Sequence, residues 1–214
     1  MSHDKNAQFP VIEPSENGPY VVKNLISLKN SKGENLPTKD VVALCRCGGS
    51  SNKPFCDGTH AKIEFRSENL HDGSKDKRDT YFGRNITIFD NRAICAHAGR
   101  CTDGLPTVWR MREEPWIDAD GAEVNAIIET VKKCPSGALS YSVEGVEHRD
   151  QDREPLVTVS QNGPYVLTGG ISLDVPRGEG ASTEHYTLCR CGGSKNKPFC
   201  DGTHWHVKFK DEKN

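Results

Sequence analysis

Nine cysteines are the most distinctive chemical feature of this 214-residue chain, and they fall into three sets of three. The N-terminal sequence MSHDKNAQFP has no basic segment followed by an apolar stretch, and no apolar run reaches about 18 residues. We therefore expect a cytoplasmic protein that does not associate with membranes. An odd number of cysteines in a reducing compartment argues against a disulfide framework and favours metal ligation.

The first and third cysteine sets share the spacing C-x-C-x8-C-x3-H. Three thiolates and one imidazole suit either zinc or an iron–sulfur cluster. Structural zinc sites usually place cysteines about two to four residues apart, and C-x-C is tighter than that. A two-iron cluster is larger than one ion, so one ligand pair can serve each iron. The spacing favours a cluster and leaves zinc open. The candidate ligands are Cys45, Cys47, Cys56 and His60, and then Cys189, Cys191, Cys200 and His204.

These two motifs belong to an internal repeat. The segments LCRCGGSSNKPFCDGTH and LCRCGGSKNKPFCDGTH, which begin at Leu44 and Leu188, differ only where Ser51 is replaced by Lys195. Each follows a second shared segment, NGPYVVKNLISL or NGPYVLTGGISL. Duplication of one metal-binding unit is the simplest explanation.

The motifs resemble the signature of the CDGSH iron–sulfur (NEET) family, with Thr59 and Thr203 where the family has serine. All four ligand positions match, as do the Lys-Pro-Phe before the third cysteine and the Asp-Gly after it. The resemblance covers about 90 of the 214 residues. It implies two [2Fe-2S] clusters with three cysteine ligands and one histidine ligand each. The first two cysteines would bind an inner iron, and the third cysteine and the histidine an outer, more exposed iron.

This ligand set favours electron transfer. A neutral imidazole in place of a thiolate makes a cluster less negative and raises its potential, as in Rieske centres. The imidazole is also titratable, so we expect one-electron transfer with some proton coupling. Cluster storage or delivery to an apo-acceptor protein uses the same ligands and stays open, as does a zinc-stabilised interaction protein. No catalytic triad, Walker loop or dinucleotide fingerprint stands out, so we do not expect an enzyme.

The middle cysteine set has the spacing of a ferredoxin that lacks one ligand. Its members are Cys95, Cys101 and Cys134. The segments CAHAGRC and Cys134-Pro135 fit the pattern C-x2-C-x2-C…C-P, except that Ala98 occupies the position of the second cysteine. Residues 84–143 resemble divergent single-cluster [4Fe-4S] ferredoxin-like domains. Three cysteines suffice for a [3Fe-4S] cluster, whereas a [4Fe-4S] cluster needs another ligand, and His97 is adjacent to the vacancy. A domain that has lost its cluster is the remaining alternative.

Short elements must position these ligands. In each copy we expect a strand after the Asn-Gly-Pro turn and a second strand that runs into the first cysteine. Asp57 and Asp201 are expected to cap a short helical turn that carries the histidine. The four expected strands are 20–22, 41–44, 165–167 and 186–188.

The middle unit is predicted to run strand, cysteine loop, helix, cysteine, strand. Ile86 and Ile88 alternate as a strand, and the polar segments 71–80 and 146–155 are expected to be linkers. The second strand is expected at Leu139, Tyr141 and Val143. The helix is expected at Val124, Ile127, Ile128 and Val131, capped by Asp118 or Asp120.

We therefore predict an α+β protein with a first CDGSH module (1–70), a divergent ferredoxin-like domain (71–150) and a second CDGSH module (151–214). A hydrophobic fraction of 34% is low for one large core and suits small units stiffened by metal. Single-motif CDGSH proteins form two-fold dimers with a shared β layer. By resemblance, residues near 16–66 and 156–210 are expected to pair about a pseudo-two-fold axis, which makes the chain a monomer. Three separate units that seek partners in other molecules are the alternative.

The charge of the chain is nearly balanced, with 28 basic and 30 acidic residues. No cluster of lysine and arginine could follow a phosphate backbone, so nucleic-acid binding is not expected. The expected partner is a redox protein or an apo-acceptor protein.

Overall fold

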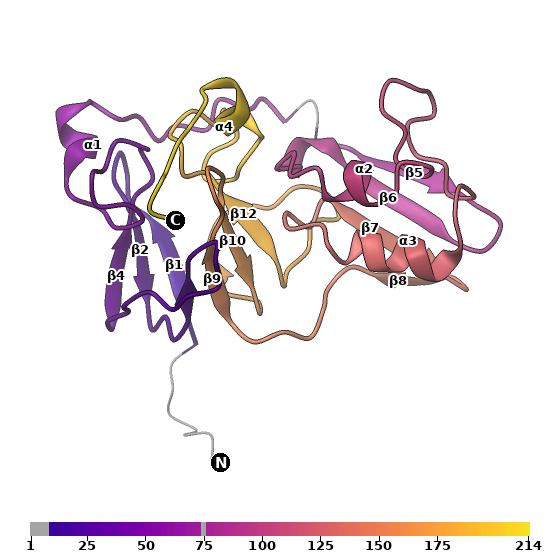
Figure 1. Ribbon diagram of the computed structural model, residues 1–214, viewed down its shortest axis with the longest axis horizontal. Helices are drawn as coiled ribbons and strands as arrows, with labels where there is room; N and C mark the ends of the chain where they lie inside the picture. Colours follow the sequence, from indigo (N-terminus) through magenta and orange to yellow (C-terminus); the bar gives the residue numbers. More distant parts are fainter. Residues whose placement is uncertain (1–8, 74–75) are drawn as a thin grey trace, which may run out of the picture.

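The computed structural model describes residues 9–73 and 76–214. Its strands form three four-stranded sheets, accompanied by a few short helices. Figure 1 shows the three parts side by side along the long axis, with the second copy of the repeat between the first copy and the middle unit. The predicted α+β class, with small β-rich units and an α+β insertion, is confirmed.

The two copies of the repeat have the same order of elements. The first contains β1 (Val11–Pro14), β2 (Tyr20–Lys23), β3 (Leu28–Lys29), β4 (Val41–Leu44) and α1 (Thr59–Lys62). The second contains β9 (Leu156–Val159), β10 (Tyr165–Thr168), β11 (Ser172–Leu173), β12 (Tyr186–Leu188) and α4 (Thr203–His206). All four strands expected in the copies are present, because each alternates buried residues with more accessible ones or lies fully buried.

The copies exchange one strand each. The first sheet has the order β11-β1-β2-β4 and the second has the order β12-β10-β9-β3, so the two-residue strand at one edge comes from the other copy. The exchanged strands pair in parallel and in equivalent register, with Ile12 opposite Leu173 and Leu28 opposite Val157. The pseudo-two-fold pairing expected from the repeat is thus present. Its form differs from one shared β layer, since two sheets each accept one strand.

One hydrophobic core joins the two sheets. Tyr20 and Tyr165 lie at its centre, and both are fully buried. Full burial of an aliphatic side chain contributes about 1.5–3 kcal/mol, so separating the copies would expose a costly surface. Other members of the core are Ile12, Val22, Leu28, Leu44, Val157, Val159, Leu167, Ile171 and Leu188.

The middle unit has its own sheet and core, and it follows the predicted order of elements. Its core contains Ile88, Trp109 and Ile127. Its elements are β5 (Arg78–Phe82), β6 (Thr87–Asn91), α2 (Arg100–Gly104), α3 (Val124–Val131), β7 (Leu139–Val143) and β8 (Val146–His148), and its sheet has the order β5-β6-β7-β8. In the described part of the chain, no helix has the length and apolar character needed to cross a membrane.

Two expectations for the middle unit were wrong. The polar segments contain the edge strands β5 and β8, because charged residues are tolerated at a sheet edge; residues 74–75 of the first segment lie outside the described residues. Helix α3 is preceded by Glu123, with no side-chain cap. Asp118 instead accepts a hydrogen bond from the backbone N–H of Asp120, 3.0 Å away, and Asp120 accepts one from that of Arg84, 2.9 Å away.

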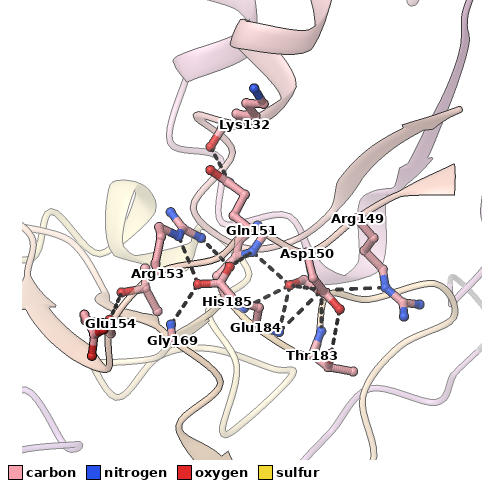
Figure 2. A network of polar contacts seen from close by, with 12 residues as sticks. Lys132, Arg149, Asp150, Gln151, Arg153, Glu154, Gly169, Thr183, Glu184 and His185 are labelled. Carbon is pink, nitrogen blue, oxygen red and sulfur yellow. Dashed lines mark hydrogen bonds and ion pairs between the residues drawn. The ribbon is translucent and has the colours of Figure 1, made fainter. Parts of the chain in front are cut away.

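The second polar segment is bonded to the second copy (Figure 2). Asp150 accepts hydrogen bonds from the hydroxyl and backbone N–H of Thr183, 2.7 and 2.9 Å away. Arg153 forms a bidentate ion pair with Glu184, at 2.9 and 2.6 Å. Gln151 donates to the carbonyl of Lys132 at 3.0 Å. These contacts fix the middle unit against the second copy.

Candidate metal centres

The inner cysteines of each motif lie together where a strand ends. Cys45 and Cys47 follow β4, and their sulfur atoms are 3.8 Å apart. Cys189 and Cys191 follow β12 with the same separation of 3.8 Å. The glycine two residues beyond each second cysteine donates its backbone N–H to that sulfur, at 3.4 Å in the first copy and 3.5 Å in the second. Such N–H···S bonds stabilise a thiolate and tune a bound cluster.

The hydrogen bond between the two sulfur atoms separates their pKa values. It lowers the pKa of Cys45 to about 6 and raises the pKa of Cys47. In the second copy it lowers the pKa of Cys191 and raises the pKa of Cys189. One sulfur of each pair is therefore the more acidic, and the charge of a bound metal would favour the thiolate form of both.

The outer ligands form a second pair in each motif. The sulfur of Cys56 lies 3.3 Å from Nδ1 of His60, and the sulfur of Cys200 lies 3.4 Å from Nδ1 of His204. Nδ1 is therefore the ring nitrogen that faces the cysteine sulfur, a detail that the sequence did not provide.

The two aspartates expected as caps lie one residue before the cap position. Gly58 and Gly202 are the capping residues, with φ angles of +86° and +82°. Asp57 nevertheless accepts the N–H of Thr59 at 3.0 Å and the N–H of Ser51 at 2.9 Å. The hydroxyl of Thr59 also donates to Asp57, and this bond is the main reason that the pKa of Asp57 is well below its usual range. The threonine thus provides the hydroxyl that serine would provide.

The donors fit a two-iron group better than a single ion. Within residues 9–73 and 76–214, no three His, Cys, Asp or Glu side chains converge as ligands of one metal ion. Each motif instead presents one sulfur–sulfur pair and one sulfur–nitrogen pair. A tetrahedral zinc site needs all four donors about 2.0–2.3 Å from one centre. This arrangement of donors matches a two-iron cluster in which each iron is bound by one of the two pairs.

Sequence reasoning missed two tyrosines, each of which holds one ligand loop in place. The hydroxyl of Tyr20 donates to the carbonyls of Cys189 and Pro198, both at 2.9 Å. The hydroxyl of Tyr165 donates to the carbonyls of Cys45 and Pro54, at 2.8 and 3.0 Å. Each tyrosine therefore fixes the ligand loop of the other copy. Its presence in both NGPY segments was the available signal.

The residue between the inner cysteines also has a structural role. Arg190 is buried, donates to the carbonyls of Gly163 and Ser160 at 2.8 and 2.6 Å, and pairs with Asp211. Arg46, its equivalent, donates to the carbonyl of Ser15 at 3.1 Å. These arginines connect each ligand loop to the turn before the central strand of its own copy.

The three middle cysteines line one cavity of about 450 Å³, together with Asp90 and Trp116. Burial raises the pKa of Cys95 to about 12 and that of Cys101 to about 11, so a metal must supply the charge that deprotonates them. The shared cavity suits a cluster held by these three cysteines.

His97, the residue next to the ligand vacancy, contacts the second copy. A Cβ atom on Gly202 would lie 2.6 Å from Cδ2 of the His97 ring. The Nδ1 atom of His97 lies 3.5 Å from a guanidinium nitrogen of Arg92. The ring therefore packs against the loop between Cys200 and His204.

Comparison with known families identifies all three parts. The model for the iron-binding zinc finger of CDGSH type matches residues 17–61 and 162–205, and the model for the divergent 4Fe-4S mono-cluster domain matches residues 81–144. The chain is 38% identical over 61 residues to the uncharacterized protein YjdI of Escherichia coli, strains K12 and O157:H7. That match spans 28% of this chain and 80% of the relative. The chain belongs to the CDGSH iron–sulfur family, with two CDGSH motifs and a divergent 4Fe-4S mono-cluster domain between them.

Proposed function

We propose that this iron–sulfur protein is a one-electron carrier with two [2Fe-2S] clusters, each bound by three cysteines and one histidine. The proposal rests on the two pairs of donor atoms in each motif. The sulfur atoms of the inner cysteines are 3.8 Å apart, and the sulfur of the outer cysteine lies 3.3 or 3.4 Å from Nδ1 of the histidine. Cys45 and Cys47, or Cys189 and Cys191, would hold the inner iron. Cys56 with His60, or Cys200 with His204, would hold the outer iron.

A bound [2Fe-2S] cluster cycles between two states that differ by one electron. The chain contributes N–H···S bonds from glycine and two ligand loops that tyrosine hydroxyls fix in place. Fixed loops keep reorganisation small when the charge of the cluster changes. These features support an electron carrier in preference to an enzyme with its own substrate.

The middle cavity would hold a [3Fe-4S] or [4Fe-4S] cluster on Cys95, Cys101 and Cys134. The exchanged strands occupy one edge of each CDGSH sheet, which supports a monomer. The partner would then be a separate cytoplasmic redox protein.

Cluster delivery to an apo-acceptor protein is the second candidate. It is favoured by the partial exposure of Cys56 and His60, which an acceptor thiol can approach. The two functions differ in outcome, because delivery empties the motif and electron transfer leaves it loaded.

The test is anaerobic purification followed by analysis of iron, acid-labile sulfide and zinc, with EPR of the dithionite-reduced protein. We expect about four iron atoms per chain from the two motifs, and about seven or eight if the middle cavity is loaded. Two equivalents of zinc without labile sulfide would contradict the proposal.

A further inference from the structure

The two CDGSH motifs are almost identical in sequence but lie in different surroundings. Gly58 and Gly202 are equivalent, and both have positive φ angles. In the described part of the chain, a Cβ atom on Gly58 would meet nothing within 4 Å, whereas one on Gly202 would meet the ring of His97 at 2.6 Å. The cysteine loop of the middle unit therefore covers the turn between Cys200 and His204, the outer ligands of the second motif.

Two hydrogen bonds hold this cover in place. The indole N–H of Trp205 donates to the carbonyl of His97 at 3.0 Å. The side-chain amide of Asn196 donates to the carbonyl of Ala93 at 3.1 Å. In the first copy, alanine occupies the position equivalent to Trp205, and Asn52, the equivalent of Asn196, is exposed.

Burial of the ligands follows the same asymmetry. Cys200 is 3% exposed and His204 is 5% exposed, whereas Cys56 and His60 are only partly buried. Because the two motifs differ at one position of 17, this difference comes from the surroundings of the motifs, the middle unit and Trp205 among them, and not from the ligand set.

The cover is also firmly attached. A Cβ atom on Gly137 would lie 2.6 Å from Cβ of Ser182, so only glycine permits the close approach of the middle unit at this point. Asn91 donates to the carbonyl of Glu179 at 3.0 Å. Together with the contacts of Asp150 and Arg153, these interactions leave the second motif between the first motif and the middle unit (Figure 1).

The inner sides of the two motifs contact each other. A Cβ atom on Gly48 would lie 2.7 Å from the carbonyl oxygen of Cys191, and one on Gly192 would lie 2.4 Å from that of Cys47. The backbones of the two C-x-C loops therefore touch across the pseudo-two-fold axis. An electron that reaches the second motif has a short route to the first.

We propose that the two motifs have different roles: the first is the site that an external one-electron redox protein reaches, and the second is an internal centre between the first motif and the middle unit. This inference rests on the proposed function, since it needs both motifs to be loaded. One electron passes from a reduced centre to an oxidised neighbour, and the external protein accepts or supplies that electron at the first motif.

The test compares two full-length variants that each keep one terminal cluster. Cys200→Ala leaves the first motif intact, and Cys56→Ala leaves the second intact. Each variant is reduced with dithionite without oxygen and exposed to the uncharged iron(II) chelator 2,2′-bipyridine, while EPR follows the remaining [2Fe-2S] signal. We expect the first motif to lose its cluster several-fold faster. Equal rates, or faster loss from the second motif through the groove lined by Arg100, Lys133 and Trp205, would overturn the inference.

A second pair of variants leaves all ligands in place. Trp205→Ala removes one bond of the cover, whereas Ala61→Trp changes the equivalent position of the uncovered motif. The wild type should lose its terminal clusters in two phases. Trp205→Ala should accelerate only the slow phase, and Ala61→Trp should leave that phase unchanged. A single phase in the wild type would contradict the inference, whereas a wild type without any [2Fe-2S] signal would contradict the proposed function itself.

Discussion

Tyr20 and Tyr165 lie edge to face at the centre of the paired copies, with ring centroids 6.1 Å apart and planes at 85°. Each hydroxyl crosses the interface and bonds to two carbonyls of the opposite ligand loop. The geometry of each candidate metal centre therefore depends on a side chain of the other copy.

Replacing these tyrosines should weaken both the fold and the metal centres. Tyr20→Phe removes the hydroxyl donor from two carbonyls of the second ligand loop. The Pro198 carbonyl keeps the backbone N–H of Cys189, whereas the buried Cys189 carbonyl loses its donor, which should cost about 1–3 kcal/mol of unfolding free energy. Urea unfolding and the reduction potential of the second cluster measure the two effects. Tyr186→Phe is the control, because its hydroxyl donates to Ile171, outside both motifs. It should lower stability and leave the potential unchanged; a similar change of potential in both variants would refute the role of Tyr20.

Replacing the histidine ligands should make the clusters more resistant to acid. Protons compete with iron for Nδ1 of His60 and His204, whereas a thiolate binds iron more strongly. The variants His60→Cys and His204→Cys should keep a cluster with a lower potential. The pH at which the visible absorbance disappears is the measurement. If the wild type and the double variant lost colour at the same pH, histidine would not be the labile ligand.

Asp90 should make the stability of the middle unit dependent on pH. This carboxyl is completely buried, and within the described part of the chain neither of its oxygens has a hydrogen-bond partner. Burial raises its pKa from 3.8 to about 7, against the opposing effect of Arg92. The folded state thus binds a proton that the unfolded state has lost, so the contribution of Asp90 to stability is greatest below about pH 4 and is lost as the pH rises through 7.

The variant Asp90→Asn should remove this dependence. The full difference between pH 4 and pH 8 is at most about 4 kcal/mol for a shift of this size. Urea unfolding at several pH values, with iron content matched, gives the measurement. Glu113→Gln is a suitable control, since the Glu113 side chain is 63% exposed. A wild type that gains stability from pH 5 to pH 8, relative to Asp90→Asn, would show that Asp90 is charged in the folded state.

A loaded middle centre should interact magnetically with the second cluster more strongly than with the first. His97 and Gly202 are in contact, and the second motif lies between the other two centres. EPR of the fully reduced protein should therefore show broadening of the [2Fe-2S] signal in Cys56→Ala that disappears when Cys134→Ser is added. The signal in Cys200→Ala should change much less. Broadening only in Cys200→Ala would place the middle centre beside the wrong motif.

Sequence reasoning succeeded where a pattern is local. The strands before the cysteines, the order of the middle unit and the pairing of the copies all follow from alternation, spacing or repetition. The exchange of β3 and β11 could not be predicted, because a two-residue strand has no periodicity of its own. The polar segments were taken for linkers, since a charged edge strand and a loop have similar composition.

The difference in burial between the outer ligands of the two motifs also could not be predicted from the sequence. The ligand segments are identical except at Ser51 and Lys195, and both of these residues are exposed. That difference depends on where a separate unit docks, which only the tertiary structure reveals. Trp205, in place of Ala61, was a local sign that the second copy has a neighbour.

The exchanged strands also constrain how this chain can evolve. If one copy of the repeat were deleted, the remaining copy would lose the strand that covers its sheet edge and half of its core. Such a descendant would have to recruit a second molecule at once or fail to fold. The duplication is therefore hard to reverse. The effect of a substitution in one copy depends on the residues that the other copy presents to it. The two copies are inherited as one unit, which leaves the loops outside the shared core free to diverge and to acquire separate tasks.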